Sequence, residues 1–392
     1  MDNLTHSLVG ATLAELALPA GAPRATRRTF FIAGIVAANL PDADLVYTSI
    51  TPPPLGALLH HRGHTHTMAG LVVLGLAMAA IWMLPSLRAA VGPLRRRFWI
   101  LLAIALTSHL VLDSWNSYGV HPFWPLSSRW YYGDAVFIME PWLWLLLGTA
   151  ATLNTVSRWG HALLGGSLAL VVSGAAFVRM VPLAGLAAPA ACAIVLGVVM
   201  RHWAPRHRAG AALALSLAFV AASFVAREVV RGKALASDAS AVRPQVVDLV
   251  LSPRGGNPLC WTVLSVVRDE PAGNYVLTRG DVAVLARSAC GSPRASDVRW
   301  DDPSTHSLAQ LRVLYRDDCW VRAWLQFGRA PSVDGDAISD LRYGSSFRGN
   351  FTTMRLRPAA EAARCPANLT AWRPPRADLL GDDTEGASPA LR

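Results

Sequence analysis

The sequence predicts an all-α polytopic membrane domain of about six to eight helices, some of half length, followed by a small, mostly β extracytoplasmic domain. The chain is 53% hydrophobic and 16% charged, whereas a typical soluble domain is about a quarter charged. Long uncharged runs are confined to the first ~230 residues, and most acidic residues come later. We therefore expect a membrane domain over 1–232, a linker over 233–244, a β domain over 245–372 and a disordered tail over 373–392.

The first two apolar runs, Leu4 to Leu18 and Thr29 to Leu40, are short. At about 1.5 Å per residue, neither crosses a hydrocarbon core of roughly 30 Å. The runs are separated by Pro19-Ala20-Gly21 and an arginine group ending at Arg28. They predict half-length helices packed inside the protein.

The middle of the domain alternates apolar runs with polar segments. Pro52-Pro53-Pro54 excludes a helix and precedes a histidine cluster, after which Thr67 to Leu84 is uncharged. A basic loop over 85–97 follows, and Phe98 to Leu112 predicts the next helix. The Pro- and Trp-rich segment from Ser114 to Tyr132 lacks an apolar period and predicts a structured loop.

Four further runs predict membrane spans: Pro141 to Val156, Trp159 to Val178, Val181 to Met200 and Ala209 to Ala226. If each run crosses in turn, eleven arginines in the connections between 24 and 208 share one side, which marks it as cytoplasmic. The net charge of +10 is thereby explained as a topology signal, so no nucleic-acid partner is expected. The polar clusters and everything after Arg227 fall on the extracytoplasmic side of a bacterial cytoplasmic (inner) membrane.

The C-terminal part changes to short β-type runs separated by Gly, Pro, Asn and Asp turns. These runs are Val246 to Leu251, Trp261 to Val267, Tyr275 to Thr278, Val282 to Leu285, Leu311 to Tyr315 and Trp320 to Phe327. Its four cysteines, at 260, 290, 319 and 365, suggest two disulfides in an exported domain. Three pairings are possible, and four buried free thiols are the alternative.

Histidines and carboxylates gather in the polar segments of the membrane domain. His109 and Asp113 are spaced i, i+4, so both project from one helix face and can bind one ion. His61, His64 and His66 lie where an extended segment enters a helix, and Asp42 and Asp44 follow a helix-breaking proline. Imidazole and carboxylate suit zinc, manganese or iron.

Several ionisable groups at one membrane depth must neutralise one another or hold a cation, because uncompensated burial is costly. A divalent metal site is therefore expected, and zinc is the first choice. The alternative is a set of satisfied polar contacts with histidines at the membrane interface.

The motifs of residues 1 to 145 resemble the family of membrane-bound, metal-dependent hydrolases regulated in some bacteria by the SOS repressor. The resemblance rests on Thr5-His6-Ser7, Pro41-Asp42-Ala43-Asp44, His61 to His66, Ser108-His109 with Asp113, Tyr118-Gly119-Val120 leading to Trp124-Pro125, and Asp134 to Ile138 before Glu140-Pro141. Glu140 is a conservative departure, because the family often has Asp there. This pattern is in turn similar to zinc-dependent phospholipase C and P1 nuclease.

That likeness implies the roles of single residues. It implies six metal ligands, which are His6, Asp42, His61, His66, His109 and Asp113. Asp44 and His64 would be further ligands or general bases, and Arg62 would pair with a substrate phosphate or make a structural contact to the Asp42 loop. The implied reaction is hydrolysis by a metal-activated water.

The membrane setting favours a lipid or other envelope phosphoester as substrate. Trp115, Trp124, Trp130, Tyr131 and Tyr132 lie where an aromatic belt meets headgroups, although they serve equally as interfacial anchors. Two other functions stay open. One is a haem or metal-ion carrier, and the other is a non-catalytic scaffold whose β domain binds an envelope partner.

Overall fold

The described part of the first 237 residues is mostly helical, with a long loop between Asp113 and Pro141, in agreement with the helical domain predicted over 1–232. The computed structural model describes residues 1–155, 157–177, 181–237, 245–285, 290, 298–344, 349–372 and 376–381. The first helical group contains α1 (Asn3–Ala17), α2 (Arg24–Asn39), η1 (Leu40–Ile50), α3 (Leu55–His60), η2 (His64–His66), α4 (Met68–Trp82), α5 (Pro85–Val91), η3 (Gly92–Leu94) and α6 (Arg95–Asp113). The second contains α7 (Pro141–Asn154), α8 (Arg158–Phe177), α9 (Leu183–Met200) and α10 (Pro205–Ser237).

Four helical stretches of the described chain are long and apolar enough to cross a membrane. They are Arg24–Ile50, Arg158–Phe177, Leu183–Met200 and Pro205–Ser237, and the bent pair Leu55–His66 with Met68–Ile81 makes a fifth if it counts as one span. α1 and α7 have 15 and 14 residues and are too short to cross alone. The half-length prediction is confirmed for α1. It is wrong for Thr29 to Leu40, which lies inside the long stretch Arg24–Ile50, and the span predicted over Pro141 to Val156 is wrong because α7 is too short.

Two parts of the sequence prediction are wrong in the first helical group. The segment expected as a basic loop over 85–97 contains α5, with Pro85 at its first turn, and the first turn of α6. α2 begins at Arg24, so its arginines lie inside the helix and not before it. Arginine is a good helix former, and a charged run at a helix end was mistaken for a connection.

α1 and α2 pack with their backbones in contact. A Cβ atom added to Gly10 would lie 2.4 Å from the carbonyl oxygen of Gly34, and one on Gly34 would lie 2.6 Å from that of Gly10. Only glycine permits this approach. It brings the polar first turn of α1 beside the end of α2, where η1 begins.

The C-terminal part contains two antiparallel sheets. β1 (Gln245–Arg254), β2 (Asn257–Asp269), β3 (Asn274–Ala283) and β4 (Val298–Trp300) pair in sequence order, and β5 (Ser304–Ser307) also pairs with β3. β6 (Pro331–Asp334), β7 (Ala337–Asp340) and β8 (Met354–Arg355) form a second sheet. η5 (Leu341–Tyr343) and α13 (Ala359–Ala362) complete the described elements apart from the helices given below. The first three predicted strand runs are confirmed. The fourth, Val282 to Leu285, is not a separate strand, because Val282 and Ala283 continue β3 and Val284 and Leu285 follow it.

Two predicted strands are instead helices, namely α11 (Leu308–Asp317) and α12 (Cys319–Trp324). Leu308, Leu311 and Tyr315 are buried at a helical spacing. Ser307 caps α11, and Asp318 accepts hydrogen bonds from the backbone N–H groups of Trp320 and Val321 at the start of α12. These runs were too short for their apolar content alone to separate strand from helix.

The tail is partly ordered. Arg376 precedes α14 (Ala377–Leu380), and Leu379 and Leu380 are buried in the core of the β domain. The prediction of disorder is therefore wrong for 376–381, and the rest of the predicted tail lies outside the described residues. The linker expected over 233–244 begins inside α10, which continues to Ser237; residues 238–244 lie outside the described part.

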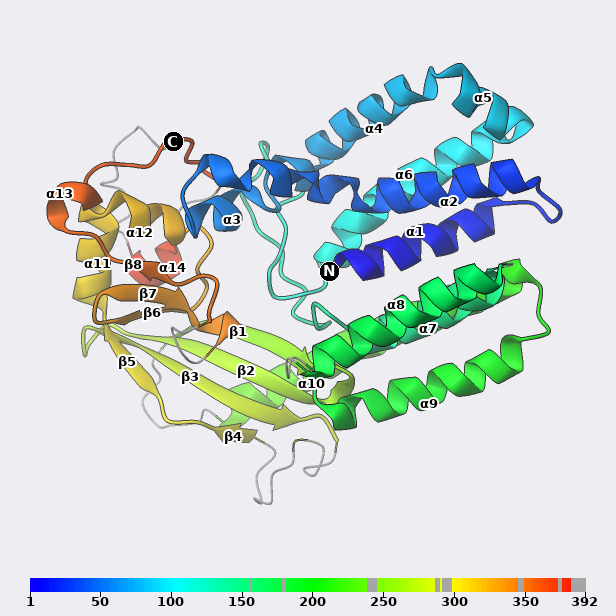
Figure 1. Cartoon of the computed structure of the whole chain (residues 1–392). Helices are drawn as coiled ribbons and strands as arrows, with labels where there is room; N and C mark the ends of the chain where they lie inside the picture. Colours follow the sequence, from blue (N-terminus) through cyan, green and yellow to red (C-terminus); the bar gives the residue numbers. More distant parts are fainter. Residues whose placement is uncertain are drawn as a thin grey trace.

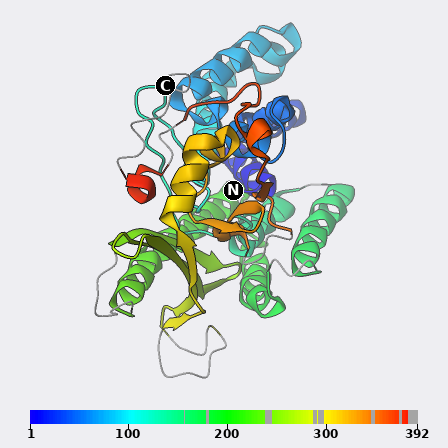
Figure 2. The same ribbon diagram turned by 90° about the vertical axis from the view of Figure 1, so that its left-hand side faces the viewer.

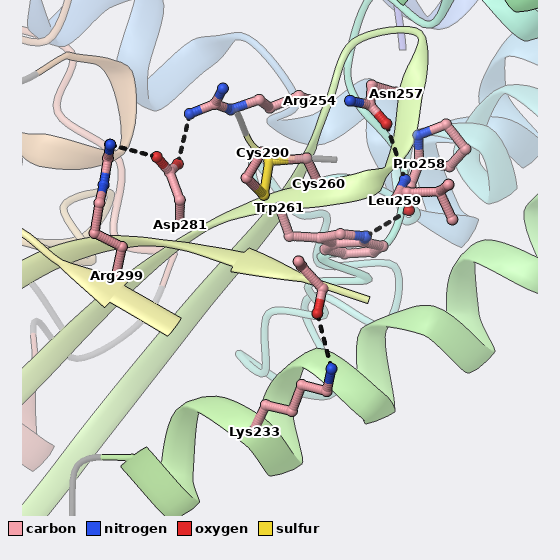
Figure 3. The surroundings of a disulfide bond; sticks show 11 residues. Lys233, Arg254, Asn257, Pro258, Leu259, Cys260, Trp261, Asp281, Cys290 and Arg299 are labelled. Carbon is pink, nitrogen blue, oxygen red and sulfur yellow. Dashed lines mark hydrogen bonds and ion pairs between the residues drawn. A yellow bond between two sulfur atoms is a disulfide. The ribbon is translucent and has the colours of Figure 1, made fainter. Parts of the chain in front are cut away.

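Both expected disulfides are present, as Cys260–Cys290 and Cys319–Cys365, which answers the open pairing and removes the free-thiol alternative. Cys192 in α9 is free. Figure 3 shows the first disulfide above α10, where Lys233 donates to the Ala283 carbonyl at 2.9 Å. This hydrogen bond joins the C-terminal part of α10 directly to β3.

The two domains share a buried junction. Figures 1 and 2 show the two helical groups with the β domain at one end of both. Leu55, Leu58 and Leu59 of α3 belong to the same apolar core as the α12 residues Val321 and Trp324. The β domain therefore packs on the end of the helices that carries the histidine-rich segment.

Candidate metal centre

Four segments bring the polar residues to the β-domain end of the first helical group. His6 lies in the second turn of α1, and Asp42 and Asp44 lie in η1. The segment from α3 to η2 carries the histidine cluster, and His109 and Asp113 lie in the last turns of α6. The close packing of α1 on α2 and the i, i+4 spacing in α6 make these segments converge.

The central group consists of Asp42, His66, His109 and Asp113, whose ligand atoms all lie within 4.8 Å of one another. His66 Nε2 is 3.5 Å from Asp42 Oδ1 and 3.2 Å from Asp113 Oδ2. His109 Nε2 is 3.4 Å and 3.6 Å from the same two oxygens. Two carboxylates and two imidazoles thus surround one small space, which is the donor set expected for a divalent cation.

A second group overlaps the first. Asp42, Asp44 and His61 also have ligand atoms within 4.8 Å of one another. His61 Nδ1 lies 3.0 Å from Asp44 Oδ1. Asp42 belongs to both groups, so its carboxylate is the element that two neighbouring ions would share.

Hydrogen bonds on the far side of the rings orient the imidazoles. His109 Nδ1 donates to the Ala38 carbonyl at 2.6 Å, and His66 Nδ1 lies 3.1 Å from Asp44 Oδ2. A proton on each Nδ1 leaves Nε2 with its lone pair directed at the centre. Asp44 also accepts from the Arg62 backbone N–H and the Thr65 hydroxyl, so it holds the histidine segment in place beside the central group.

His6 completes the buried wall. Its ring stacks on His109 with centroids 3.8 Å apart, and its Nε2 lies 3.4 Å from Asp113 Oδ1. The Met1 amino group contacts the same oxygen. His6 is fully buried, and neither ring nitrogen has a hydrogen-bond partner among the described residues. A cation would satisfy such an imidazole, so the residues present fit a metal.

Residues 1–230, which is more than half of the chain and includes every residue of the centre, match a known family, the YdjM inner membrane protein family. This chain belongs to the YdjM inner membrane protein family. The β domain lies beyond the matched residues. As a YdjM-family protein with apolar helices, the chain is an inner membrane protein.

Two curated proteins are similar to this YdjM-family chain. It is 30% identical over 132 residues to inner membrane protein YbcI of Escherichia coli (strain K12), which is 33% of this chain and 68% of YbcI. It is 26% identical over 148 residues to the uncharacterized protein YfhP of Bacillus subtilis (strain 168), which is 37% of this chain and 43% of YfhP. The chain thus spans less than half the length of YfhP. No solved structure matches.

The YdjM match confirms the membrane-bound family that the motifs resemble. The hydrolase activity, the zinc and the likeness to P1 nuclease stay predictions. Of the six ligands implied by the resemblance, five belong to the two groups and His6 lies against Asp113.

Arg62 is buried and contacts the centre from inside the YdjM fold. Its Nε lies 2.9 Å from Asp113 Oδ2, and its Nη2 donates to Asp113 Oδ1 at 3.0 Å. Its Nη1 lies 3.2 Å from the carbonyl oxygens of Asp113 and Gly119. These contacts hold the Asp113 carboxylate and occupy the guanidinium.

His64 is exposed and lies outside both ligand groups. Its ring contacts Trp124 and Trp372, with centroids 5.3 and 4.7 Å away. Trp372 also donates to the Leu59 carbonyl and packs on His121. The segment of the C-terminal part ending at Trp372 therefore covers the histidine segment, and no pattern in the sequence links positions so far apart.

Two further residues support the centre and were missed by the sequence interpretation. Asn3 donates to Asp42 Oδ2 at 2.6 Å from an exposed position at the start of α1. His121 donates through Nε2 to the Arg62 carbonyl at 2.9 Å, and burial lowers the pKa of His121 to about 4, so it is neutral. Asn3 precedes the Thr5-His6-Ser7 motif by two positions, which is the one signal that could have suggested it.

Proposed function

We propose that this chain is a membrane-bound, metal-dependent hydrolase that acts on a phosphoester of lipid or cell-envelope material. The observation that carries the proposal is the sharing of Asp42 by two overlapping ligand groups. Paired ions are a common arrangement for displacement at phosphorus. The donor set of nitrogen and oxygen atoms suits zinc, with manganese or iron as alternatives.

Among the described residues of the two ligand groups, His61 and Asp42 have the most exposed side chains. Asp113, His66 and His109 are buried to within about 1% exposure, whereas the side chains of His61 and Asp42 are 22% and 10% exposed. A substrate would therefore approach past His61, Asp42 and the neighbouring Asn3. The buried side excludes water, which strengthens electrostatic contacts to a developing negative charge.

The chain's own groups would divide the work. A divalent cation at the centre would lower the pKa of a water molecule and stabilise negative charge on the attacked group. Asp44 would be a ligand in the second group and would also orient the histidine segment, because it accepts from His61, Arg62 and Thr65. Asp42 reaches the exposed side and would orient the attacking water.

The proposed roles of Arg62 and His64 differ from each other. Arg62 would keep Asp113 in position, since its guanidinium contacts lie within the protein. His64 would need to act at the exposed side as a proton carrier, beside Trp124. A His64→Ala variant with unchanged activity would remove that role without affecting the rest.

We further propose that the centre and the β domain lie on the extracytoplasmic side. The N-terminal ends of α2 and α10, which carry arginines, and α5 with Arg88 lie at the end of the helices away from the sheets (Figure 1). Positive connections favour the cytoplasm, and disulfides favour an oxidising compartment.

Haem binding is disfavoured by the arrangement. The Nε2 atoms of His66 and His109 lie 3.0 Å apart beside two carboxylates. Axial histidines must approach a haem from opposite faces, whereas these rings meet one side of a small polar space.

The test combines elemental analysis with hydrolysis of a chromogenic phosphodiester and of phospholipid, using the full chain purified in detergent. Wild-type protein should hold stoichiometric metal and hydrolyse at least one of the two substrates. Asp42→Asn should weaken metal binding most. His61→Ala and Asp113→Ala should also weaken it, and each loss of metal affinity should exceed the roughly 10- to 100-fold typical of residues that only hydrogen-bond to a ligand. His202→Ala, at an exposed histidine outside the centre, is the matched control.

The outcomes separate metal binding from catalysis. Full metal occupancy in Asp42→Asn, His61→Ala and Asp113→Ala would contradict the centre itself. Stoichiometric metal without hydrolysis of either substrate would contradict the hydrolase and favour a metal carrier. A visible absorption spectrum with a Soret band would favour haem.

A further inference from the structure

A pocket of about 730 Å³ lies where the α6–α7 loop, the C-terminal part of α10 and strand β1 meet. None of the six residues expected as metal ligands is among the described residues that line it. The pocket is therefore separate from the metal centre, although Ser114 in its wall directly follows Asp113.

The pocket has an excess of positive charge. Four arginines and two aspartates line it. Both aspartates, Asp134 and Asp248, are bound by Arg329, at 2.9 and 2.8 Å. The two aspartates that line the pocket therefore do not neutralise its other three arginines, Arg129, Arg227 and Arg231.

Two of these three arginines, Arg129 and Arg231, are available to a ligand. The third, Arg227, already pairs with Glu228 and donates to the Gly133 carbonyl. Arg129 and Arg231 are exposed, and no described carboxylate pairs with either; Arg129 lies over the Tyr131 ring at 5.1 Å. Planar guanidinium groups bind phosphate oxygens in pairs, which makes a phosphate-bearing anion the best match.

The position of the pocket along α10 places it at headgroup level. From Ala209 to Ala226 the helix carries 18 uncharged residues, which at 1.5 Å each span about 27 Å, close to a hydrocarbon core. Arg227 follows directly, and Arg231 lies one turn further on the same face. Below them, Leu217 and Val225 are 50% and 67% exposed, so they face the hydrocarbon of a membrane.

Aromatic groups complete the lining. Trp130, Tyr131, Tyr132 and Phe224 surround the basic groups, a combination typical of the membrane interface. The Trp130 indole N–H is shielded from solvent and has no hydrogen-bond partner among the described residues. It leaves a donor beside the pocket for an oxygen-rich ligand.

We infer that this pocket binds the phosphate-bearing headgroup of an anionic phospholipid, with the acyl chains lying along the apolar surface of α10 below Arg227. The inference goes beyond the proposed function and does not depend on hydrolysis, because the pocket and the centre share no expected ligand. Bound lipid would bridge α10, the α6–α7 loop and β1, and so would brace the junction of the two domains.

The test is native mass spectrometry of the full chain, delipidated in neutral detergent and titrated with phosphatidylglycerol and phosphatidylcholine. Wild-type protein should retain one phosphatidylglycerol at a concentration at least tenfold below that needed for phosphatidylcholine. Arg129→Gln/Arg231→Gln should need at least tenfold more phosphatidylglycerol. Arg316→Gln, which removes an exposed arginine of the β domain, should behave like wild type.

Soluble ligands distinguish the source of the phosphate. Glycerol 1-phosphate and inorganic phosphate should bind far more weakly than the lipid, because they lack acyl chains. Equal retention of the two lipids by wild type, equal phosphatidylglycerol retention by the double variant, or soluble phosphate binding as tightly as the lipid would each overturn the inference. Metal content and thermal unfolding of the double variant show whether it is folded. If it is not, the preference of the wild-type protein for phosphatidylglycerol over phosphatidylcholine tests the inference.

Discussion

The backbones of Gly10 in α1 and Gly34 in α2 are in direct contact, since an added Cβ on Gly10 would lie 2.4 Å from the Gly34 carbonyl oxygen. His6 lies one helical turn before Gly10, and Asp42 follows two turns after Gly34. The spacing between these two glycines therefore controls the spacing between two residues of the candidate metal centre.

We expect Gly10→Ala to destabilise the chain by about 1–3 kcal/mol, the usual cost of overpacking, and to weaken metal binding although Gly10 touches no ligand. Thermal unfolding and metal titration measure both effects. The matched control is Gly166→Ala in α8, where an added Cβ meets nothing within 4 Å. There alanine should be neutral or stabilise by up to about 1 kcal/mol, because it is the better helix former. Equal behaviour of the two variants would contradict the packing argument.

The junction of the domains depends on Arg329. Its guanidinium pairs with Asp134 of the α6–α7 loop and Asp248 of β1, and lies 4.1 Å from the centre of the Tyr132 ring. Arg329→Met leaves the buried Asp134 carboxylate without its cation and leaves the half-buried Asp248 only the more distant Arg376, so the free energy of unfolding should fall by about 3–5 kcal/mol. Denaturant unfolding of the full chain measures the change. Arg316→Met, at an exposed pair with Asp317, should leave stability unchanged, and a similar loss in both variants would show that Arg329 has no special role.

Glu140 should make stability depend on pH. It precedes α7, accepts from the backbone N–H groups of Trp142 and Gly256, and burial raises the pKa of its carboxyl group from 4.5 to about 8. A carboxyl whose pKa is raised by folding stabilises the folded state fully below pH 4.5, and that contribution is lost as the pH rises through 8. Wild-type Tm should therefore fall more steeply between pH 5 and 9 than the Tm of Glu140→Gln, which keeps the acceptor and cannot ionise. Parallel Tm curves would show that Glu140 does not titrate in this range.

Sidedness can be tested with single cysteines in a Cys192→Ala background. Ala272 lies in the exposed turn between β2 and β3, and Ala20 lies in the exposed turn between α1 and α2. A membrane-impermeant maleimide added to spheroplasts should label Ala272→Cys and spare Ala20→Cys until the membrane is permeabilised. The reverse pattern would put the centre and the β domain in the cytoplasm.

The long helices of the membrane domain could be predicted because each depends on a long local run, whereas the short helices α3 and α5 could not. Uncharged stretches such as Val181 to Met200 exclude every structure but a buried or lipid-facing helix, since backbone polar groups must be satisfied within the segment. The runs around Leu311 and Trp320 carry no such constraint. These runs form helices because Ser307 and Asp318 cap their first turns and because their apolar side chains are buried in the core of the β domain.

The residue types of the centre could also be predicted, since His109 and Asp113 share a helix face by their spacing alone. The different positions of His64 and His66 could not. The two residues are both polar and two positions apart, yet η2 turns His66 inward to Asp42 and Asp113, and His64 outward to Trp124. A short turn sets such a difference, and its shape depends on contacts with η1 and the covering Trp372.

The amino-acid sequence by itself determined that this chain has an apolar helical part, a disulfide-bearing sheet domain and a set of imidazole and carboxylate groups able to hold a cation. Hydrophobic runs and residue chemistry are local properties, so they can be read along the chain. Only the tertiary structure decided that Asp42 is common to two ligand groups, that Arg62 holds Asp113, and that arginines from α10 and the α6–α7 loop line one pocket. These relationships join segments up to about a hundred residues apart, and their distances depend on how the helices pack.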